Sequence, residues 1–308
     1  MELKELLSIV KNEFAAPEGI DYHELLPELE RNLGSPDTKI RENSMEVLWH
    51  WETKGILTET ELIELGKRMA ANLSFGLGEA ETDSVFLRSF SALILRGVIH
   101  TDKLLLEGKL KGLKSFMKVE LLKKWSEQAI EYFVKEQDLR GFIPIKEWAH
   151  SLAHCSDLLW ELALHPLIGK EEHLKILEAL AQKFTQPATC VFTASEEARI
   201  CRVVAAIQRR NLVLPKEYEK WLQQIITPYA ETKWFEDMDD LSILQFKLNA
   251  RVNVRLFLHR LANLLQLKEE DFDETQKLIF KDISQYRDLL LEMIDKGFKK
   301  MIGSNIYG

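Results

Sequence analysis

The sequence is poor in the residues that interrupt regular structure: of 308 residues, only 14 are glycine and 8 are proline. Collagen-like and low-complexity chains carry far more of both, so the composition excludes these classes. With 46% hydrophobic and 29% charged residues, the chain has the composition of a folded globular protein. A chain of this length buries roughly three quarters of the surface that it exposes when unfolded, which allows a large core.

Cysteine is equally scarce, and long apolar runs are missing. The three cysteines, Cys155, Cys190 and Cys201, form no CxxC pair and stand among apolar residues, so we expect core thiols in a reducing compartment instead of a disulfide framework. No apolar run approaches the ~18 residues of a membrane span. The first residues, MELKELLSIVKNEF, carry charges throughout and lack the apolar centre of a signal peptide. These features predict a cytoplasmic protein without a membrane partner.

Positive charge is in deficit, with 41 Lys and Arg against 49 Asp and Glu and a net charge of −8. Nucleic-acid binding depends on neutralising phosphates and calls for a basic surface. The most basic stretch, residues 109–125, spreads its lysines over several helical faces and contains no arginine. We therefore expect no nucleic-acid partner.

The usual catalytic signatures are missing too. The sequence contains no HExxH, no GxSxG and no P-loop, and FGLGEAE (75–81) lacks the third glycine of GxGxxG. Peptide hydrolysis by the common motifs, nucleotide hydrolysis and dinucleotide redox chemistry are therefore unsupported.

What the sequence does have is a helical period almost everywhere. Apolar stripes and helix-boundary residues predict helices over the following ranges: 2–14, 22–33, 35–55, 59–74, 82–99, 116–136, 145–164, 170–185, 194–211, 216–229, 241–266 and 273–301. Five prolines fall at these boundaries, as helix sterics require. The fold class is all-α.

The predicted helices group into pairs. The second helices begin near 36, 82, 145, 194, 241 and 284. Four of the five spacings are close to the roughly 40–47 residues of HEAT and armadillo repeats, and the longer one, from 82 to 145, contains a Gly- and Lys-rich insertion around 101–115. SPDTKIRENSMEVL (35–48) also resembles a HEAT second helix, with Asp37 at the turn and Arg41 four residues later. We therefore predict one domain over 1–308, a right-handed α-solenoid of about six helical pairs.

EWAHSLAHCSDLLWEL (147–162) is the most unusual stretch. On a helical wheel its polar residues, His150, His154, Asp157 and Glu161, form one narrow arc that contains no lysine or arginine. A solvent-exposed face in this lysine-rich chain would carry some. The arc is therefore predicted to face the interior, where its members must be hydrogen-bonded, hydrated or liganded.

Two histidines at i and i+4 can share one transition metal such as zinc or iron. Asp157 is too far along the helix from His150 to be a third ligand and is better placed to orient the His154 ring. A complete site would need a ligand from another helix, for which Glu197 is the first choice because it leans toward an apolar arc. Its neighbour Glu196 is already explained by a capping box with Thr193. The other interpretation is that both histidines are structural.

Other charged residues stand among apolar ones. Arg88 could grip an anion with its planar guanidinium or pair with a carboxylate between repeats. Asp138 and Arg140 lie at a helix end just before the histidine segment. Asn249 and Asn253, four residues apart, suggest a structural asparagine ladder.

Several of these segments together resemble a known family. DLRGF followed by EWAHSLAHCSDLLWEL, with TDSVFLRSFSALIL upstream and FTASEEARI and NVRLFLHRL downstream, is similar to the bacterial domain-of-unknown-function family 2785 over roughly residues 80–260. Glu147 stands where the family pattern has glycine. The resemblance implies a helical, HEAT-like fold and no established activity. It implies that the following positions matter: Arg88, Asp138, Arg140, His150, His154, Asp157, Glu197 and Arg199. Of these, Arg88, Asp138, Arg140 and Arg199 are expected to bind a ligand or an anion.

Two functions follow from these predictions. The first is a cytoplasmic binding or scaffold module whose polar concave pocket recognises a protein segment or a small-molecule ligand. The second is a metal-dependent hydrolase or related enzyme, with His150 and His154 as ligands and Glu197 as third ligand or general base. In that enzyme Arg88 or Arg140 would hold an anionic substrate group. A HEAT-type enzyme acting on DNA lesions is a third option, against which the acidic charge counts.

Overall fold

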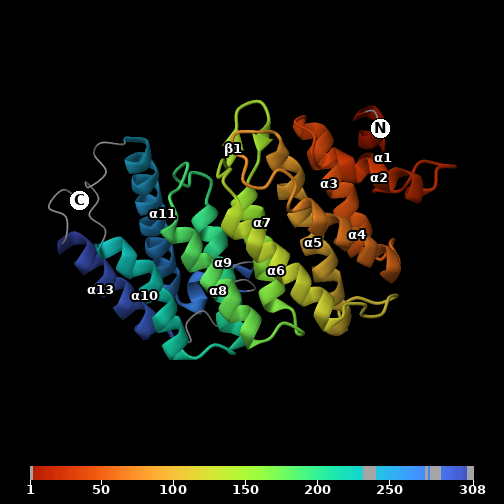
Figure 1. The fold of residues 1–308 in the computed structure, drawn as a ribbon. Helices are drawn as coiled ribbons and strands as arrows, with labels where there is room; N and C mark the ends of the chain where they lie inside the picture. Colours follow the sequence, from red (N-terminus) through yellow and green to blue (C-terminus); the bar gives the residue numbers. More distant parts are fainter. Residues whose placement is uncertain (1–2, 232–240, 275–276, 278–285, 304–308) are drawn as a thin grey trace. The chain divides into compact units, whose positions relative to one another are not determined.

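The computed structural model describes residues 3–231, 241–274, 277 and 286–303 (Figure 1). The chain divides into two compact units, Met1–Leu167 and Ile168–Gly308. Each unit is helical, which confirms the all-α class, whereas the single cooperative domain stays a prediction.

The first unit contains seven helices and one short hairpin within its described residues: α1 (Leu3–Lys11), α2 (Tyr22–Asn32), α3 (Thr38–Thr53), α4 (Glu59–Asn72), α5 (Ser84–Leu106), α6 (Val119–Lys135), β1 (Phe142–Ile143), β2 (Glu147–Trp148) and α7 (Ser151–Leu164). The second unit contains α8 (Lys170–Thr185), α9 (Glu196–Arg210), α10 (Pro215–Glu231), α11 (Leu241–Gln266), the 3₁₀ turn η1 (Glu269–Asp271) and α13 (Arg287–Gly303). Part of the predicted helix 273–301 lies outside the described residues.

In the first unit, alternate helices pack side by side. α5 contacts α3 on one side and α7 on the other, while α2, α4 and α6 each pack against the helix that follows them in the chain (Figure 1). Arg41 near the start of α3 lies over the Phe86 ring near the start of α5, and Glu52 near the end of α3 lies against Gly97 of α5. α3 and α5 therefore run in the same direction.

The same holds for α5 and α7. Ser89 near the start of α5 contacts His154, and His100 nearer its end contacts Glu161. α3, α5 and α7 thus form a layer of three parallel helices, described below as the second-helix layer. Its inward faces supply a large part of the core, including Trp51, Phe86, Phe90 and Leu159, each no more than 1% exposed.

The second unit repeats this packing. α8 contacts α10, α9 contacts α11, and α13 packs on both α10 and α11. The side chains of Asn249 and Asn253 on α11 bond to the backbone of the loop before α9, through the Ala188 carbonyl at 3.0 Å and the Phe192 N–H at 2.7 Å. Both asparagines are thus structural, as predicted: their amides bond to backbone groups that this loop would otherwise leave unpaired. No ladder of asparagines is seen among the described residues.

The largest departure from the predicted helices is the segment 145–150. α7 begins at Ser151, not at 145, and the preceding residues form an antiparallel hairpin in which Ile143 pairs with Glu147. Ile145, Glu147 and His150 have φ values of 73°, 60° and 46°, in the left-handed region that ends or interrupts a right-handed helix. Because none of the three is glycine, the sequence pattern alone did not indicate the turn. Glycine would adopt the Glu147 conformation without strain.

All three cysteines are free thiols, and Cys155 and Cys201 are buried. No helix in the described part of the chain is both long enough and apolar enough to cross a membrane.

Candidate binding site

Arg88 on α5 is fully buried, and protein acceptors occupy its whole guanidinium group. Nε and one Nη2 N–H donate to the two carboxylate oxygens of Glu136 at 2.5 and 2.8 Å. Nη1 donates to Ser84 Oγ at 2.8 Å and to the Phe75 carbonyl at 3.5 Å, and Nη2 also donates to the Glu79 carbonyl at 3.3 Å. The geometry supports the pairing interpretation of Arg88, because no N–H is left for a substrate anion.

Asp138 and Arg140 bind each other in the loop after α6. Arg140 Nε donates to Asp138 Oδ1 at 2.8 Å and Nη2 donates to Oδ2 at 2.5 Å. Asp138 also accepts from the Glu81 N–H, and Arg140 donates to the Thr82 carbonyl, both at 3.0 Å. These hydrogen bonds to Asp138 raise the pKa of Arg140. The pair therefore fastens this loop to the residues just before α5.

His150 and His154 belong to a chain of ring contacts that runs from the hairpin to the core. Phe142 meets Trp148 edge to face at 5.0 Å, and Trp148 stacks on His150 at 4.4 Å. The two imidazole centroids are 5.5 Å apart, and His154 meets Phe90 at 5.2 Å. Phe142 and Trp148 are 52% and 41% exposed, whereas Phe90 is 1% exposed. The two histidines are neighbours as predicted, although His150 is the residue before α7 and not part of it.

A serine fixes the tautomer of His154. Ser89 Oγ donates its one hydrogen to the Ala149 carbonyl, so at its 2.9 Å contact with His154 it can only accept. The Nδ1 of His154 therefore carries a proton, and in the neutral ring Nε2 is the basic nitrogen. Asp157 is 2% exposed, which confirms that its side of α7 faces the interior. Its role in orienting His154 stays a prediction.

The metal interpretation gains no support from this arrangement. Within the described ranges, no group of three or more His, Cys, Asp or Glu side chains is placed to hold a metal ion. Structural and catalytic zinc sites need at least three protein ligands. A zinc or iron centre on His150 and His154 would thus depend on a rearrangement.

Glu197 and Arg199 lie on α9 in the second unit, and both are half-buried. The predicted capping box is wrong: the residue before α9 is Ser195, with φ 63°, and Glu196 instead accepts from the Ala194 N–H at 2.9 Å. The predicted roles of Glu197 as ligand or base and of Arg199 in binding stay predictions.

Glu161 is the centre of a charged cluster that the sequence did not reveal. It is fully buried on α7, accepts from His100 Nδ1 at 3.0 Å, pairs with Lys103, and has Arg96 Nε 3.8 Å away. Burial alone would raise the pKa of this carboxyl, but the hydrogen bond from His100 and the charges of Lys103 and Arg96 hold its pKa at about 2. Glu161 is therefore ionised at every physiological pH.

Arg96 differs from Arg88 in having no acceptor. Its guanidinium carbon lies over the rings of Trp49 on α3 and Trp160 on α7, 5.1 and 5.3 Å from their centroids. None of the described residues accepts a hydrogen bond from Arg96, and its Nε is buried without a partner. Its side chain is 20% exposed, and both tryptophans are half-buried. The three side chains therefore form a partly exposed group, which we call the tryptophan–arginine cluster.

Glu52 lies beside this cluster. It is fully buried, and neither carboxyl oxygen has a hydrogen-bond partner among the described residues. Its carboxyl group occupies the place of the side chain that Gly97 lacks, because a Cβ there would be 1.7 Å from Glu52 Oε1. Burial raises the pKa of Glu52 well above its usual value, and Arg96 opposes this only in part. The neutral acid is therefore favoured.

A sequence signal for this cluster exists in retrospect. Arg96, His100 and Lys103 recur at i, i+4 and i+7 on one face of an otherwise apolar helix. Linking them to Trp49 and Trp160 requires the parallel packing of α3, α5 and α7, which the sequence does not show.

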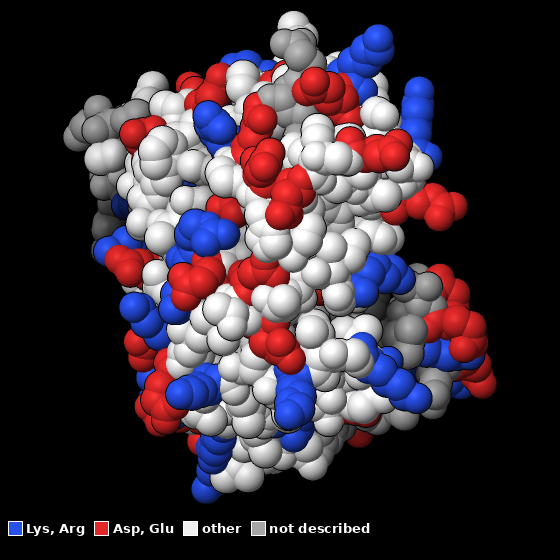
Figure 2. Space-filling model, turned by 90° about the vertical axis from the view of Figure 1, so that its right-hand side faces the viewer, with Lys and Arg blue, Asp and Glu red and all other residues white. Residues whose placement is uncertain are grey.

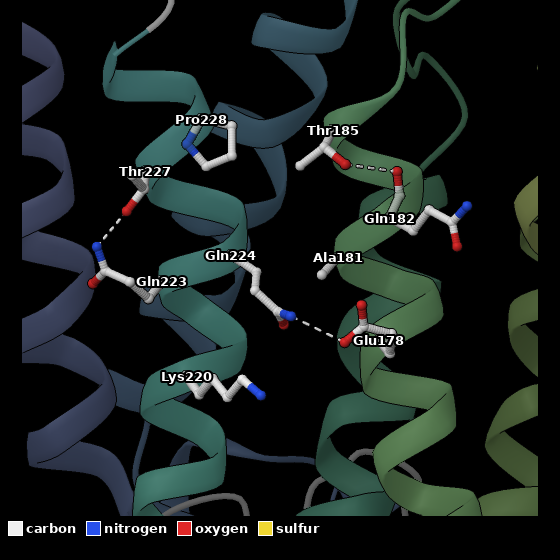
Figure 3. Close-up of a pocket in the computed structure, with 9 residues that line it drawn as sticks. All are labelled: Glu178, Ala181, Gln182, Thr185, Lys220, Gln223, Gln224, Thr227 and Pro228. Carbon is white, nitrogen blue, oxygen red and sulfur yellow. Dashed lines mark hydrogen bonds between the residues drawn. The ribbon is translucent and has the colours of Figure 1, made fainter.

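The second unit has an open groove of about 590 Å³ between α8 and α10 (Figure 3). Gln224 of α10 donates to Glu178 of α8 across it at 3.0 Å. The remaining lining residues are Ala181, Gln182, Thr185, Lys220, Gln223, Thr227 and Pro228. The described lining residues include two charged side chains, Glu178 and Lys220, and no histidine, cysteine or aromatic residue.

The surface charge is mixed. Lys and Arg side chains are interspersed with Asp and Glu over the face in Figure 2, with uncharged surface between them. This distribution agrees with the net charge of −8 and gives no basic stripe on that face.

The fold and these clusters define a helical protein whose buried polar groups are mostly bonded to one another. Over residues 73–262 the chain matches the family described as Protein of unknown function (DUF2785), and it belongs to this family. The match confirms the resemblance found in the sequence and includes α5 and α7, whereas Trp49 and Glu52 of α3 precede it. No curated protein and no solved structure matches the chain.

Proposed function

We propose that this protein is a binding module, built as a right-handed α-solenoid of the HEAT or armadillo kind with about six helical pairs. The packing within each unit supports this architecture, since alternate helices pack side by side and each helical pair contacts the next pair in the chain. The parallel direction of α3, α5 and α7 is what a stack of identical two-helix repeats requires.

The ligand surface is the second-helix layer, which lines the concave side of such a solenoid. One observation carries the proposal: Trp49, Arg96 and Trp160 come from three successive second helices and meet at a partly exposed position. A ligand there would contact three repeats at once. It would be a small molecule or a protein segment; the acidic charge argues against nucleic acid, and the free thiols suit the cytoplasm.

A metal-dependent hydrolase is not favoured. Arg88 and Arg140 bond to Glu136 and Asp138 instead of facing a substrate, and no third ligand accompanies the two histidines within the described residues. The binding function relies on the partly exposed tryptophan–arginine cluster, whereas the enzyme would need Arg88 and Arg140, whose donors are already bonded.

Two measurements test the proposal. Small-angle X-ray scattering tests the architecture, because a compact globule of this length would have a radius of gyration of about 19 Å. We expect a clearly larger value, and 19 Å would contradict the solenoid.

The second measurement is a thermal-shift screen of small-molecule classes, short peptides and divalent metals. It compares the wild type with a Trp49→Ala/Trp160→Ala variant and a His150→Ala/His154→Ala variant. Stabilisation by a compound or peptide that disappears only in the tryptophan variant supports the binding module. Stabilisation by zinc or iron that disappears only in the histidine variant would establish the metal alternative, and a screen with no stabilising compound contradicts the binding function.

A further inference from the structure

We propose that Arg96, assisted by His100, binds the oxyanion group of a ligand, a carboxylate or a phosphate, at the tryptophan–arginine cluster. The inference rests on the proposed binding function and names the chemical group that the second-helix layer recognises.

The first support is the hydrogen-bonding state of Arg96. A guanidinium group carries five N–H donors in a plane and matches the two oxygens of a carboxylate or phosphate. The rings of Trp49 and Trp160 cover its faces, so partners can reach it only along its N–H edge. No described residue accepts a hydrogen bond at that edge, where Oε2 of Glu161 lies 3.8 Å from Nε. Arg88 on the same helix, in contrast, has all its donors occupied. The two tryptophan rings thus hold the guanidinium group by its faces, and its Nη atoms make no hydrogen bond to a described residue.

The second support is the local charge. Glu161 is the ionised carboxylate nearest to Arg96, and Lys103 and His100 already bond to it. Burial raises the pKa of Glu52 well above its usual value, which disfavours its charged form. Glu161 carries one negative charge against the two positive charges of Lys103 and Arg96, whose Nε lies 3.8 Å from its Oε2, so a net positive charge remains here and favours an incoming anion.

His100 extends the site toward solvent. Its side chain is 28% exposed, and its ring stacks on Trp49 with the centroids 6.4 Å apart. Because ionised Glu161 can only accept, Nδ1 of His100 is the donor in their hydrogen bond. The Nε2 atom on the other side of the ring donates to an oxyanion when the ring is in its imidazolium form.

The third support is unmet hydrogen bonding beneath the cluster. Both oxygens of Glu52, Nε of Arg96 and Oε2 of Glu161 are buried without a hydrogen-bond partner. Buried polar groups in folded proteins are almost always satisfied. An oxyanion can accept from Nε of Arg96 and from the hydroxyl of a protonated Glu52, whereas Oε2 of Glu161 is itself an acceptor and lies 3.8 Å from Nε of Arg96.

The test is a calorimetric titration of the full chain with inorganic phosphate and, separately, with acetate at constant ionic strength. We expect saturable binding of at least one of them, and the comparison of the two shows which oxyanion is preferred. Arg96→Gln should weaken it by about tenfold or more, since a charge-assisted bidentate contact is lost. Arg96→Lys keeps the charge but not the planar donors and should weaken it by a smaller factor.

Arg68→Gln is the matched control. Arg68 lies in the same unit, is 48% exposed and pairs with Glu30 at 2.7 Å. Its replacement by glutamine removes the same charge at a position away from the cluster and should leave anion binding unchanged. Circular dichroism of each variant checks that the helices are intact. If Arg96→Gln misfolds, the Arg96→Lys result decides alone.

Binding that is equally strong in Arg96→Gln and wild type would overturn the inference, as would the absence of binding to both anions. If the tryptophan-dependent ligand of the thermal-shift screen is then neutral or cationic, the binding function survives and only the oxyanion assignment fails. If that screen also finds no ligand, the binding function fails with it.

Discussion

Two arginines on α5, separated by two helical turns, have opposite surroundings. Arg88 is fully buried, and its donors bond to Glu136, Ser84 and two backbone carbonyls. Arg96 lies between α3 and α7 with tryptophan rings over its faces and no acceptor at its edge. The sequence drew attention to Arg88, yet the structure leaves Arg96 open. An arginine among apolar residues thus indicates a buried charge, and only its acceptors show whether that charge serves the fold or a ligand.

The largest effect is expected from replacing the two arginines in turn. Arg88→Met leaves the Glu136 carboxylate buried without a cation and should lower the free energy of unfolding by about 3 to 5 kcal/mol. Arg96→Met leaves no hydrogen-bond acceptor without its donor, so it should lower the free energy of unfolding by about 1 kcal/mol or less, through lost packing. Urea denaturation of both variants measures the difference. The double variant Arg88→Met/Glu136→Leu should recover much of the loss, because an apolar pair leaves no buried charge. If Arg88→Met and Arg96→Met lower the free energy of unfolding equally, the proposed difference between a structural and a ligand-binding arginine is wrong.

The next effect concerns Glu161, which is the ionised partner at the Arg96 end. Its folded pKa of about 2 lies below the unfolded value, so its contribution is present above the unfolded pKa and disappears as the pH falls toward 2. Glu161→Gln should lower the free energy of unfolding by about 2 to 3 kcal/mol at pH 7 and flatten the acid side of the stability curve. Urea denaturation between pH 2 and pH 7 measures this. Glu131→Gln, at an exposed pair with Lys135, is the control and should change little.

Glu52 should give stability a pH dependence opposite in sign to that of Glu161. Its pKa is raised well above the usual value by burial, so the protonated acid is stable at low pH and stability is lost as the pH rises through the folded pKa. Glu52→Gln cannot ionise, and we expect it to match the wild type near pH 4 and to exceed it by about 1 kcal/mol in alkaline buffer. Thermal melting across this pH range measures the effect. A wild-type curve that runs parallel to the Glu52→Gln curve over the whole range would show that the pKa of Glu52 is not raised.

The smallest effect belongs to the hairpin near the Arg88 end of the layer. Ile145 is 96% exposed and has φ 73°, a conformation that is unfavourable for a β-branched residue. Asparagine tolerates it better, so Ile145→Asn should raise the free energy of unfolding by about 0.5 to 1 kcal/mol. Ile145→Val keeps the β-branch and the strain and should change nothing. A stabilisation by valine as well would mean that exposed apolar area is the cause, not backbone strain.

Much of the fold could be predicted because helical periodicity is local. The inward orientation of Asp157 and Glu161 also followed from a local feature, a polar arc without lysine. The hairpin was missed because its left-handed residues are isoleucine, glutamate and histidine, which give no glycine signal. The tryptophan–arginine cluster was missed because Trp49 and Arg96 become neighbours only through the register of two parallel helices, which depends on long-range packing.

His150 combines two requirements in one residue. Its backbone is left-handed, with φ 46°, and its ring stacks on Trp148 and makes a tilted contact with the ring of His154. Glycine or asparagine would suit the backbone and lose the ring, whereas tyrosine or phenylalanine would keep a ring and strain the backbone. The amino acids that other family members have at this position would therefore record which requirement evolution has preserved, the shape of the turn or the chemistry of the imidazole.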